Sequence, residues 1–242
     1  MSGVMAALLS VAALVLVVGL AARIWVYASV PAPLRIATMP APLTRGGVAL
    51  RILREIALFE SLFRADKLLW IAAVLFHGGM LLVLLRHLRY FLEPVPWLVT
   101  LEQPFGVIGA FAMMVGLLAL LARRLLLPTI RSISRAGDFA LLLLLLAIGA
   151  SGLTMTFLVH TDIPVLKKFV VGLLTLDWQA IPADPALIAH LTMVSLLMLV
   201  MPFSKLLHIP GIFFSPTRNQ VDDARERRRV AAWARPLDAG RP

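Results

Sequence analysis

The sequence lacks cysteine altogether and has few charged residues. Only 15% of its 242 residues are Asp, Glu, Lys or Arg, whereas a soluble domain of this size has about 25%. The composition therefore excludes an ordinary soluble globule, a disordered chain and a disulfide scaffold. Without cysteine, the chain itself has no ligands for an iron–sulfur cluster, a zinc–thiolate site or a thioether-attached haem. Histidine is the strongest metal-ligating side chain that remains.

Apolar residues make up 60% of the chain and gather in long runs. A membrane-spanning helix needs about 20 mostly apolar residues. Five stretches meet this requirement: residues 4–28, 68–91, 105–122, 138–159 and 185–208. The expected fold is an all-α membrane protein, a bundle of five transmembrane helices.

The distribution of basic residues predicts the orientation of this bundle. Lys and Arg number six in 29–67, four in 123–137 and seven after His208, against none before the first span, none in 92–104 and two in 160–184. Because basic loops stay in the cytoplasm, the N-terminus is predicted outside and the C-terminus inside. With no basic residue before Arg23, the first stretch lacks the n-region of a signal peptide, and we expect a retained anchor. The net charge of +10 then reflects topology, and no nucleic-acid partner is expected.

Two cytoplasmic segments have a character of their own. Residues 30–45 contain four prolines and are expected to be extended. Residues 47–64 have the pattern of an amphipathic helix that can lie on the membrane surface or dock a partner. We assign residues 1–210 to the five-span domain and residues 211–242 to a basic cytoplasmic tail, marginally helical over 219–234.

Four of the five histidines fall in two of the predicted spans. His77 and His87 are ten residues apart in the second span, about 15 Å along a helix and about 80° around it. His190 and His208 in the fifth span are 18 residues apart, five full turns, and so share one face about 27 Å apart. These two spans run antiparallel in the predicted topology. His87 therefore lies with His190 near the outer surface, and the other two lie together near the inner one.

Two histidine pairs at two depths are the arrangement that two six-coordinate haem b groups require. The unequal separations, about 15 Å and about 27 Å, need helix tilt or a bend near Pro202. Gly78 and Gly79, beside His77, leave room for a flat macrocycle, although close helix packing would use the same residues. The other interpretations are a metal or proton pathway and a purely structural role. A pathway would need carboxylates in mid-span, and Asp138 is expected only to cap the fourth span.

Several segments resemble known families. LFHGGMLLVLLRH at 75–87 and AHLTMVSLLMLVMPFSKLLHIPG at 189–211 resemble the gamma-subunit family of respiratory nitrate reductases, and the resemblance covers the second to fifth spans. Within that superfamily, the chain is similar to the DsrM family, the membrane cytochromes b of the Dsr complexes associated with sulfite reduction. That similarity is carried by the proline-rich 29–46 segment, FESLFRADKLLW at 59–70, LRHLRYFLEP at 85–94 and LTMTFLVHTDIP at 153–164.

The resemblance implies a di-haem cytochrome b in a bacterial inner membrane. By this resemblance His87 and His190 ligate the outer haem b, and His77 and His208 the inner one. It also implies menaquinol or menaquinone as the substrate near the outer haem, as in a quinol:acceptor oxidoreductase of dissimilatory sulfur metabolism. The implied partners are a cytoplasmic heterodisulfide-reductase-like iron–sulfur subunit, a multihaem cytochrome c, an iron–sulfur protein and a second membrane subunit.

Further residues acquire expected roles in such a protein. His160 and Asp162, at the outer end of the fourth span, are expected to form the quinol site and take up its protons. The other interpretation is that Asp162 caps a short helix. Arg86 and Arg89, at the outer end of the second span, are expected to bind haem propionates, or else lipid phosphates. Lys205 is expected to serve the inner haem similarly.

Functions of other classes remain open at this point. A membrane anchor for a soluble enzyme would need no haem, and a metal or proton transporter would bind metal without a haem spectrum. Within the redox class, the alternative is a nitrate reductase gamma subunit proper. The proline-rich loop and the HTDIP segment at 160–164 argue against it by resemblance.

Overall fold

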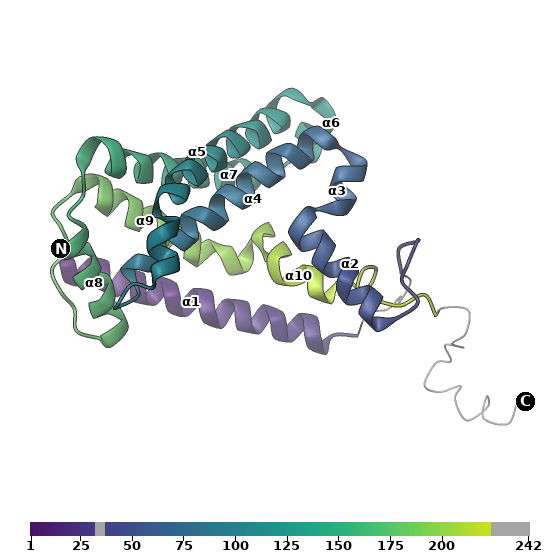
Figure 1. Ribbon diagram of the computed structural model, residues 1–242, viewed down its shortest axis with the longest axis horizontal. Coiled ribbons are helices and arrows are strands. Elements are labelled where there is room, and N and C mark those ends of the chain that lie inside the picture. The colour runs from purple at the N-terminus through teal and green to yellow at the C-terminus, as the bar shows by residue number, and fades with distance from the viewer. Residues whose placement is uncertain (32–36, 224–242) are drawn as a thin grey trace, which may run out of the picture. The chain divides into compact units, whose positions relative to one another are not determined.

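The computed structural model describes residues 1–31 and 37–223, and the regular elements of this part are all helical. Five of its helices are long and apolar enough to cross a membrane. They are α1 (Ser2–Ser29), α4 (Lys67–His87) with the 3₁₀ turn η1 (Leu88–Tyr90), α5 (Trp97–Leu126), α7 (Ala136–Thr154) with the π turn η2 (Met155–Val159), and α9 (Pro185–Val200) with the 3₁₀ turn η3 (Met201–Phe203) (Figure 1). The predicted all-α, five-span fold is confirmed, whereas the direction in which it crosses the membrane stays a prediction.

The chain divides into two compact units, residues 1–21 with 59–206 and residues 22–58 with those from 207 onward. The second unit holds α2 (Arg45–Leu58) and α10 (His208–Phe214). Within it, the Thr38 N–H donates to the Thr217 carbonyl at 2.9 Å, and Arg218 pairs with Glu55 at 2.9 Å. Residues 37–44 are not helical, as expected of the proline-rich segment. Most of the predicted 219–234 helix lies outside the described residues.

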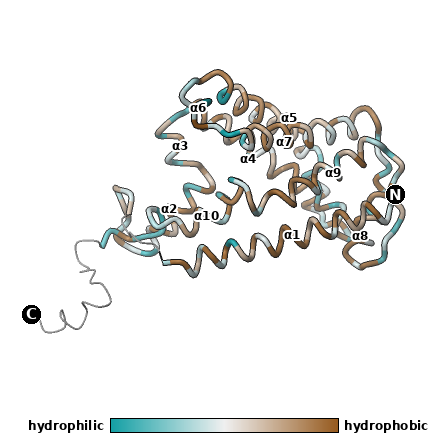
Figure 2. Tube along the Cα trace, turned by 180° about the vertical axis from the view of Figure 1, so that it is seen from behind, coloured by the Kyte–Doolittle hydropathy of each residue, from teal (hydrophilic) through white to brown (hydrophobic). Residues whose placement is uncertain are grey.

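The centre of the first unit is a bundle of α4, α5, α7 and α9 (Figure 1). α5 packs along α4 and α7, and α9 packs along α7. Phe76, Met113 and Leu117 form a core between α4 and α5. A second core joins α1, α8 (Ile163–Thr175) and α9, with Phe169 fully buried. Many large apolar residues are exposed on the outsides of these helices, and Figure 2 shows that α1 is largely hydrophobic along its length. Such faces suit a lipid solvent.

α4 and α5 approach each other closely through glycines. A Cβ atom at Gly79 would lie 2.6 Å from the Met113 backbone nitrogen, and one at Gly116 would lie 2.6 Å from that of Phe76. A larger residue at either position would overlap the partner backbone, so this spacing requires glycine. Phe76, the earlier residue on α4, meets Gly116, and Gly79, the later one, meets Met113. Contacts thus run in opposite directions along the two helices, which therefore pack antiparallel. Gly79 therefore serves helix packing, one of the two uses expected for it.

The fifth span ends earlier than the sequence predicts. α9 stops at Val200, η3 follows, and His208 begins the separate helix α10. Pro202 has no N–H, and its ring clashes with the carbonyl four residues back, so the α-helical hydrogen bonds are interrupted and the chain passes into the 3₁₀ turn η3. The prediction of one continuous 185–208 helix, with His190 and His208 five turns apart on one face, is therefore wrong.

Two other helices differ in their bounds. α5 begins at Trp97 rather than at residue 105, because its first turns accommodate polar residues: the Gln103 side chain donates to the Val99 carbonyl at 2.8 Å. The helix predicted over 47–64 is broken at Phe59, whose φ of 49° is left-handed, into α2 and α3 (Glu60–Ala65).

Asp66 fixes the start of α4. Its Oδ1 accepts a hydrogen bond from the Leu69 N–H at 3.0 Å, and Arg123 pairs with Oδ2 at 3.4 Å. The Leu69 N–H, and to a smaller degree Arg123, hold the pKa of this carboxyl below its ordinary value. A lowered pKa stabilises the folded state above the unfolded pKa, and this stabilisation is lost as the pH falls through the folded one. Acid is therefore expected to loosen this end of α4.

We expect Gly79→Ala to destabilise the protein, because its methyl group would overlap the α5 backbone, an overpacking that costs about 1–3 kcal/mol. Gly78→Ala is the matched control, since nothing lies within 4 Å of a Cβ built at Gly78. Thermal unfolding in detergent, followed by circular dichroism, should give a lower midpoint for Gly79→Ala alone. Equal midpoints for the two variants would contradict the close contact of α4 with α5.

Candidate functional site

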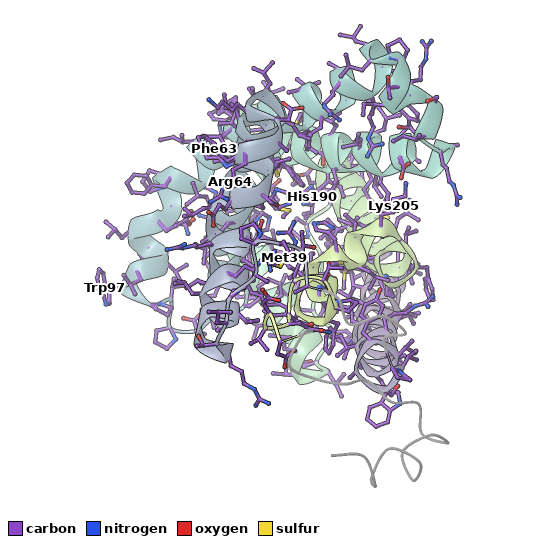
Figure 3. The ribbon with its side chains drawn as sticks, turned by 90° about the vertical axis from the view of Figure 1, so that its right-hand side faces the viewer. Met39, Phe63, Arg64, Trp97, His190 and Lys205 are labelled. Atoms are coloured by element: carbon purple, nitrogen blue, oxygen red, sulfur yellow. The ribbon has the colours of Figure 1, made fainter. Side chains whose placement is uncertain are left out.

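The structure brings together His87, the last residue of α4, and His190, near the start of α9. Their ring centroids lie 6.4 Å apart, and their ring planes are 10° from parallel. His190 is 8% exposed, and Figure 3 shows it among the side chains between the helices. Two imidazoles from two different spans thus lie beside each other, nearly parallel, inside the bundle.

One nitrogen of each ring has a defined partner. His87 Nδ1 lies 2.6 Å from the Val83 carbonyl oxygen. His190 Nδ1 lies 2.9 Å from Ser151 Oγ, and the Ser151 hydroxyl donates to the Ile148 carbonyl at 2.9 Å. A carbonyl only accepts, and the serine proton is already used, so we assign a proton to both Nδ1 atoms. Nε2 is then the unprotonated nitrogen on each ring, which is the form in which histidine binds a metal.

The spacing of the two rings fits one metal ion between them. A metal–imidazole bond is about 2.0–2.1 Å long and the bonded nitrogen lies about 1.2 Å from the ring centroid, so two imidazoles that bind one ion from opposite sides would have centroids about 6.5 Å apart. Among the described residues, no group of three or more His, Asp or Glu side chains could hold a metal ion. An ion bound by His87 and His190 therefore needs its other ligands from outside the protein, as iron obtains them from a porphyrin. The donor set fits a haem.

His77 shows the same local arrangement deeper in α4. Its Nδ1 lies 2.9 Å from the Ala73 carbonyl oxygen, four residues back. The rings of Phe76 and Phe59 flank it at centroid distances of 4.6 and 5.1 Å. His208, the partner predicted for His77, begins α10 in the second unit, and their pairing stays a prediction.

Arg86 and Arg89 connect the end of α4 to the start of α5. The Arg86 guanidinium donates to the Gln103 carbonyl, and the Gln103 side-chain oxygen accepts from Arg89 at 2.9 Å. Arg89 also donates to the Tyr90 hydroxyl at 3.0 Å and lies over its ring, with Cζ 4.9 Å from the centroid. Two positive charges are thus held beside His87, where the sequence predicts haem propionates. Propionate binding itself stays a prediction.

A carboxylate that the sequence analysis did not select lies beside this cluster. Both carboxylate oxygens of Glu102, in the second turn of α5, are enclosed and accept no hydrogen bond, and Arg89 Nε is enclosed and unpaired as well. A Cβ atom at Gly106 would lie 2.6 Å from Arg86 Cβ and 3.0 Å from Glu102 Oε1, so these two residues flank Gly106. The predicted span started at residue 105, so Glu102 was expected to lie in a loop, whereas the helix starts at Trp97 and includes it. The signal that could have found it was a Glu between apolar residues next to a predicted span.

Lys205 pairs with Asp138 at the start of α7. The distance from Lys205 Nζ to Asp138 Oδ2 is 2.6 Å, and Arg124 lies 3.8 Å from the same oxygen. Asp138, which is 7% exposed, also accepts from the Arg135 N–H at 3.0 Å and so caps α7, as expected. The role of Lys205 at the inner haem stays a prediction.

His160 and Asp162 lie between η2 and α8. His160 is exposed and has a left-handed backbone with φ of 55°. Asp162 caps α8, because its Oδ1 accepts from the Val165 N–H at 3.1 Å. The capping function expected as the other interpretation of Asp162 is therefore present, and the quinol function of both residues stays a prediction.

Comparison with known proteins places the chain in a family. Residues 59–221 match the family described as the nitrate reductase gamma subunit, and the chain belongs to that family. Two curated relatives, from Archaeoglobus profundus and Archaeoglobus fulgidus, are each named Hdr-like menaquinol oxidoreductase cytochrome b-like subunit. They are 35% identical over 215 residues and 36% identical over 219, which covers 76% and 79% of this chain. The chain spans 63% and 66% of the length of these relatives.

We expect Asp138→Asn to lower the free energy of unfolding by about 1–3 kcal/mol. The reason is that the Arg135 N–H and the Lys205 ammonium lose the charged oxygen to which they donate. Adding Lys205→Met to Asp138→Asn should cost less than Lys205→Met alone, since the negative charge that pairs with Lys205 is already removed. Unfolding midpoints of the wild type, the two single variants and the double variant would give the coupling energy. Strictly additive effects would contradict the pairing of Lys205 with Asp138.

Proposed function

We propose that this chain is the di-haem b membrane subunit of a menaquinol oxidoreductase, exchanging electrons between the menaquinone pool and a cytoplasmic iron–sulfur partner. The observation that carries this proposal is the placement of His87 and His190, with ring centroids 6.4 Å apart and both Nδ1 atoms engaged by the protein. Membership of the nitrate reductase gamma family and the printed names of the two relatives support it.

In this proposal His87 and His190 hold one haem b, and His77 and His208 hold the other. A haem with two imidazole ligands supplies one-electron transfer and leaves no open coordination position for a substrate. The protein orients the rings through the Val83 carbonyl and Ser151, which accept a hydrogen bond from each Nδ1–H and so raise the basicity of each Nε2. Arg86 and Arg89 are proposed to bind the propionates of the outer haem, and Lys205 one of the inner haem.

The five long apolar helices indicate a multi-pass membrane protein, and we assign it to the cytoplasmic membrane of the cell. The basic loops put His87 and His190 toward the outer side. Oxidation of quinol there, with His160 and Asp162 at the quinol site, would release protons outside while electrons move inward. Reduction of quinone by electrons from the cytoplasm would use the same residues in reverse.

We further propose that the chain belongs to the DsrM branch and functions in dissimilatory sulfur metabolism. The partner would be a heterodisulfide-reductase-like iron–sulfur subunit, which the Hdr-like names of the relatives support. A multihaem cytochrome c, an iron–sulfur protein and a second membrane subunit would complete the complex. The absence of cysteine from the sequence agrees with iron–sulfur clusters carried by partners.

The haem content of histidine variants tests this proposal. We expect a reduced-minus-oxidised spectrum with pyridine-haem quantification to give two haem b per wild-type chain and one for His87→Ala or His190→Ala. These two variants should lose the same haem, whereas His77→Ala and His208→Ala lose the other. His160→Ala is the matched control and should keep both. Two haems in His87→Ala, or no haem in wild-type protein made with ample haem, would overturn the proposal.

Ser151→Ala should keep both haems but raise the midpoint potential of one. Loss of the acceptor for the His190 Nδ1–H makes that imidazole less basic, and a less basic imidazole stabilises oxidised iron less. The midpoint potential rises by about 59 mV for each tenfold decrease in the preference of the site for oxidised over reduced iron. Ser195→Ala is the control, because the Ser195 hydroxyl donates to the Leu191 carbonyl of its own helix. A redox titration followed optically would measure both, and equal potentials would contradict the role of Ser151.

A further inference from the structure

Glu102 is a buried carboxylate of the described bundle that the proposed function does not use. Both of its oxygens are enclosed without a hydrogen bond, within a helix long and apolar enough to span a membrane. Ionisable side chains in such positions are costly, and they commonly mark ligand sites or proton relays. Carboxylates accept hydrogen bonds and, when ionised, donate none. Glu102 therefore lacks a donor.

The packing of α5 on α4 sets the level of Glu102 in the bundle. Gly106 lies against Arg86, and the two helices run antiparallel. Glu102, one turn before Gly106, consequently lies opposite the turn that follows Arg86. That turn contains His87, whose ring faces His190. Glu102 and the histidine pair are therefore at the same depth.

A chain of contacts joins this pair to the neighbour of Glu102. The His87 ring lies 5.7 Å from the Tyr90 ring, centroid to centroid, in an edge-to-face arrangement. The Tyr90 hydroxyl accepts from Arg89, which in turn donates to the Gln103 side chain. Arg89 still has an enclosed Nε without an acceptor. The cluster thus offers one unused acceptor group, Glu102, and one unused donor.

We propose that Glu102 accepts the protons of the quinol that is oxidised beside His87 and His190. This inference rests on the proposed function, and it assigns to Glu102 the proton uptake that the sequence suggested for His160 and Asp162. A quinol hydroxyl is both donor and acceptor, so its O–H can donate to the Glu102 carboxylate, which has no other donor.

The reaction balances with one carboxylate acting twice. Oxidation of one quinol to quinone breaks two O–H bonds and releases two protons and two electrons. The Glu102 carboxylate takes the first proton, passes it to water on the outer side, and then takes the second. The electrons leave one at a time to the one-electron acceptor that the proposed function assigns to His87 and His190. General-base assistance of this kind is worth about 10²–10⁴-fold in rate.

The surroundings of Glu102 predict a pH dependence. The charged group that acts on it from α4 is Arg86, and the other charged or titratable groups in that turn and in η1 are His87, Arg89 and Tyr90. α7, the other helix packed along the length of α5, has no titratable side chain after Asp138. The rate of quinol oxidation should therefore fall as the pH is lowered and Glu102 becomes protonated.

Glu102→Gln in the full-length, haem-loaded protein tests the inference, because glutamine keeps the shape and removes the proton acceptor. The matched control is Glu93→Gln, an exposed carboxylate paired with Lys167. The probe is reduced menadiol, mixed by stopped flow with oxidised protein over a range of pH, and haem reduction is followed optically. Dithionite reduction and haem content are measured alongside, since neither needs the carboxylate.

We expect Glu102→Gln to keep its haem and its dithionite reduction, to slow reduction by menadiol at least 100-fold, and to lose the pH dependence. Glu102→Asp should recover part of the rate, and Glu93→Gln should behave as wild type. If the Glu102→Gln variant is reduced by menadiol at the wild-type rate and with the wild-type pH profile, the role of Glu102 is overturned, while the proposed function stands. Wild-type protein that holds haem but is not reduced by menadiol would overturn the proposed function as well.

Discussion

The close contact between α4 and α5 is the constraint on which the candidate site depends. Gly79 and Gly116 let the two backbones touch, so the register of the two helices has little freedom. That register brings Arg86 and the following turn against the first turns of α5. In a membrane little water is available to satisfy polar groups, so those at the end of this hairpin pair with one another. Arg86, Arg89, Tyr90 and Gln103 form one hydrogen-bonded cluster, and Glu102 lies beside it without a partner.

Histidine orientation is achieved by two different routes. His87 and His77 use the carbonyl oxygen four residues back on their own helix, so their orientation is encoded locally in α4. His190 uses Ser151 on α7, and its orientation depends on the packing of α7 against α9. The two rings that face each other are therefore held by different parts of the bundle. This difference allows Ser151 to adjust one ring without disturbing the other.

The sequence predicts the number of spans and the meeting of His87 with His190, because apolar runs and basic loops set topology directly. It does not predict the break at Pro202, because a proline in an apolar run can either bend a helix or end it. It also does not predict Glu102. The residue becomes conspicuous only through the antiparallel packing that encloses it, and such lateral contacts between spans leave no periodic signal in the sequence. Ser151 is hidden from sequence analysis for the same reason.

The central claim is that His87 and His190 ligate one iron, and an experimental density map of the haem-loaded protein tests it most directly. The account predicts a haem between α4 and α9, its iron bonded to Nε2 of both residues, with the Nδ1 atoms still held by the Val83 carbonyl and Ser151. A map that shows no haem between these rings, or a haem ligated there by any other side chain, would contradict it.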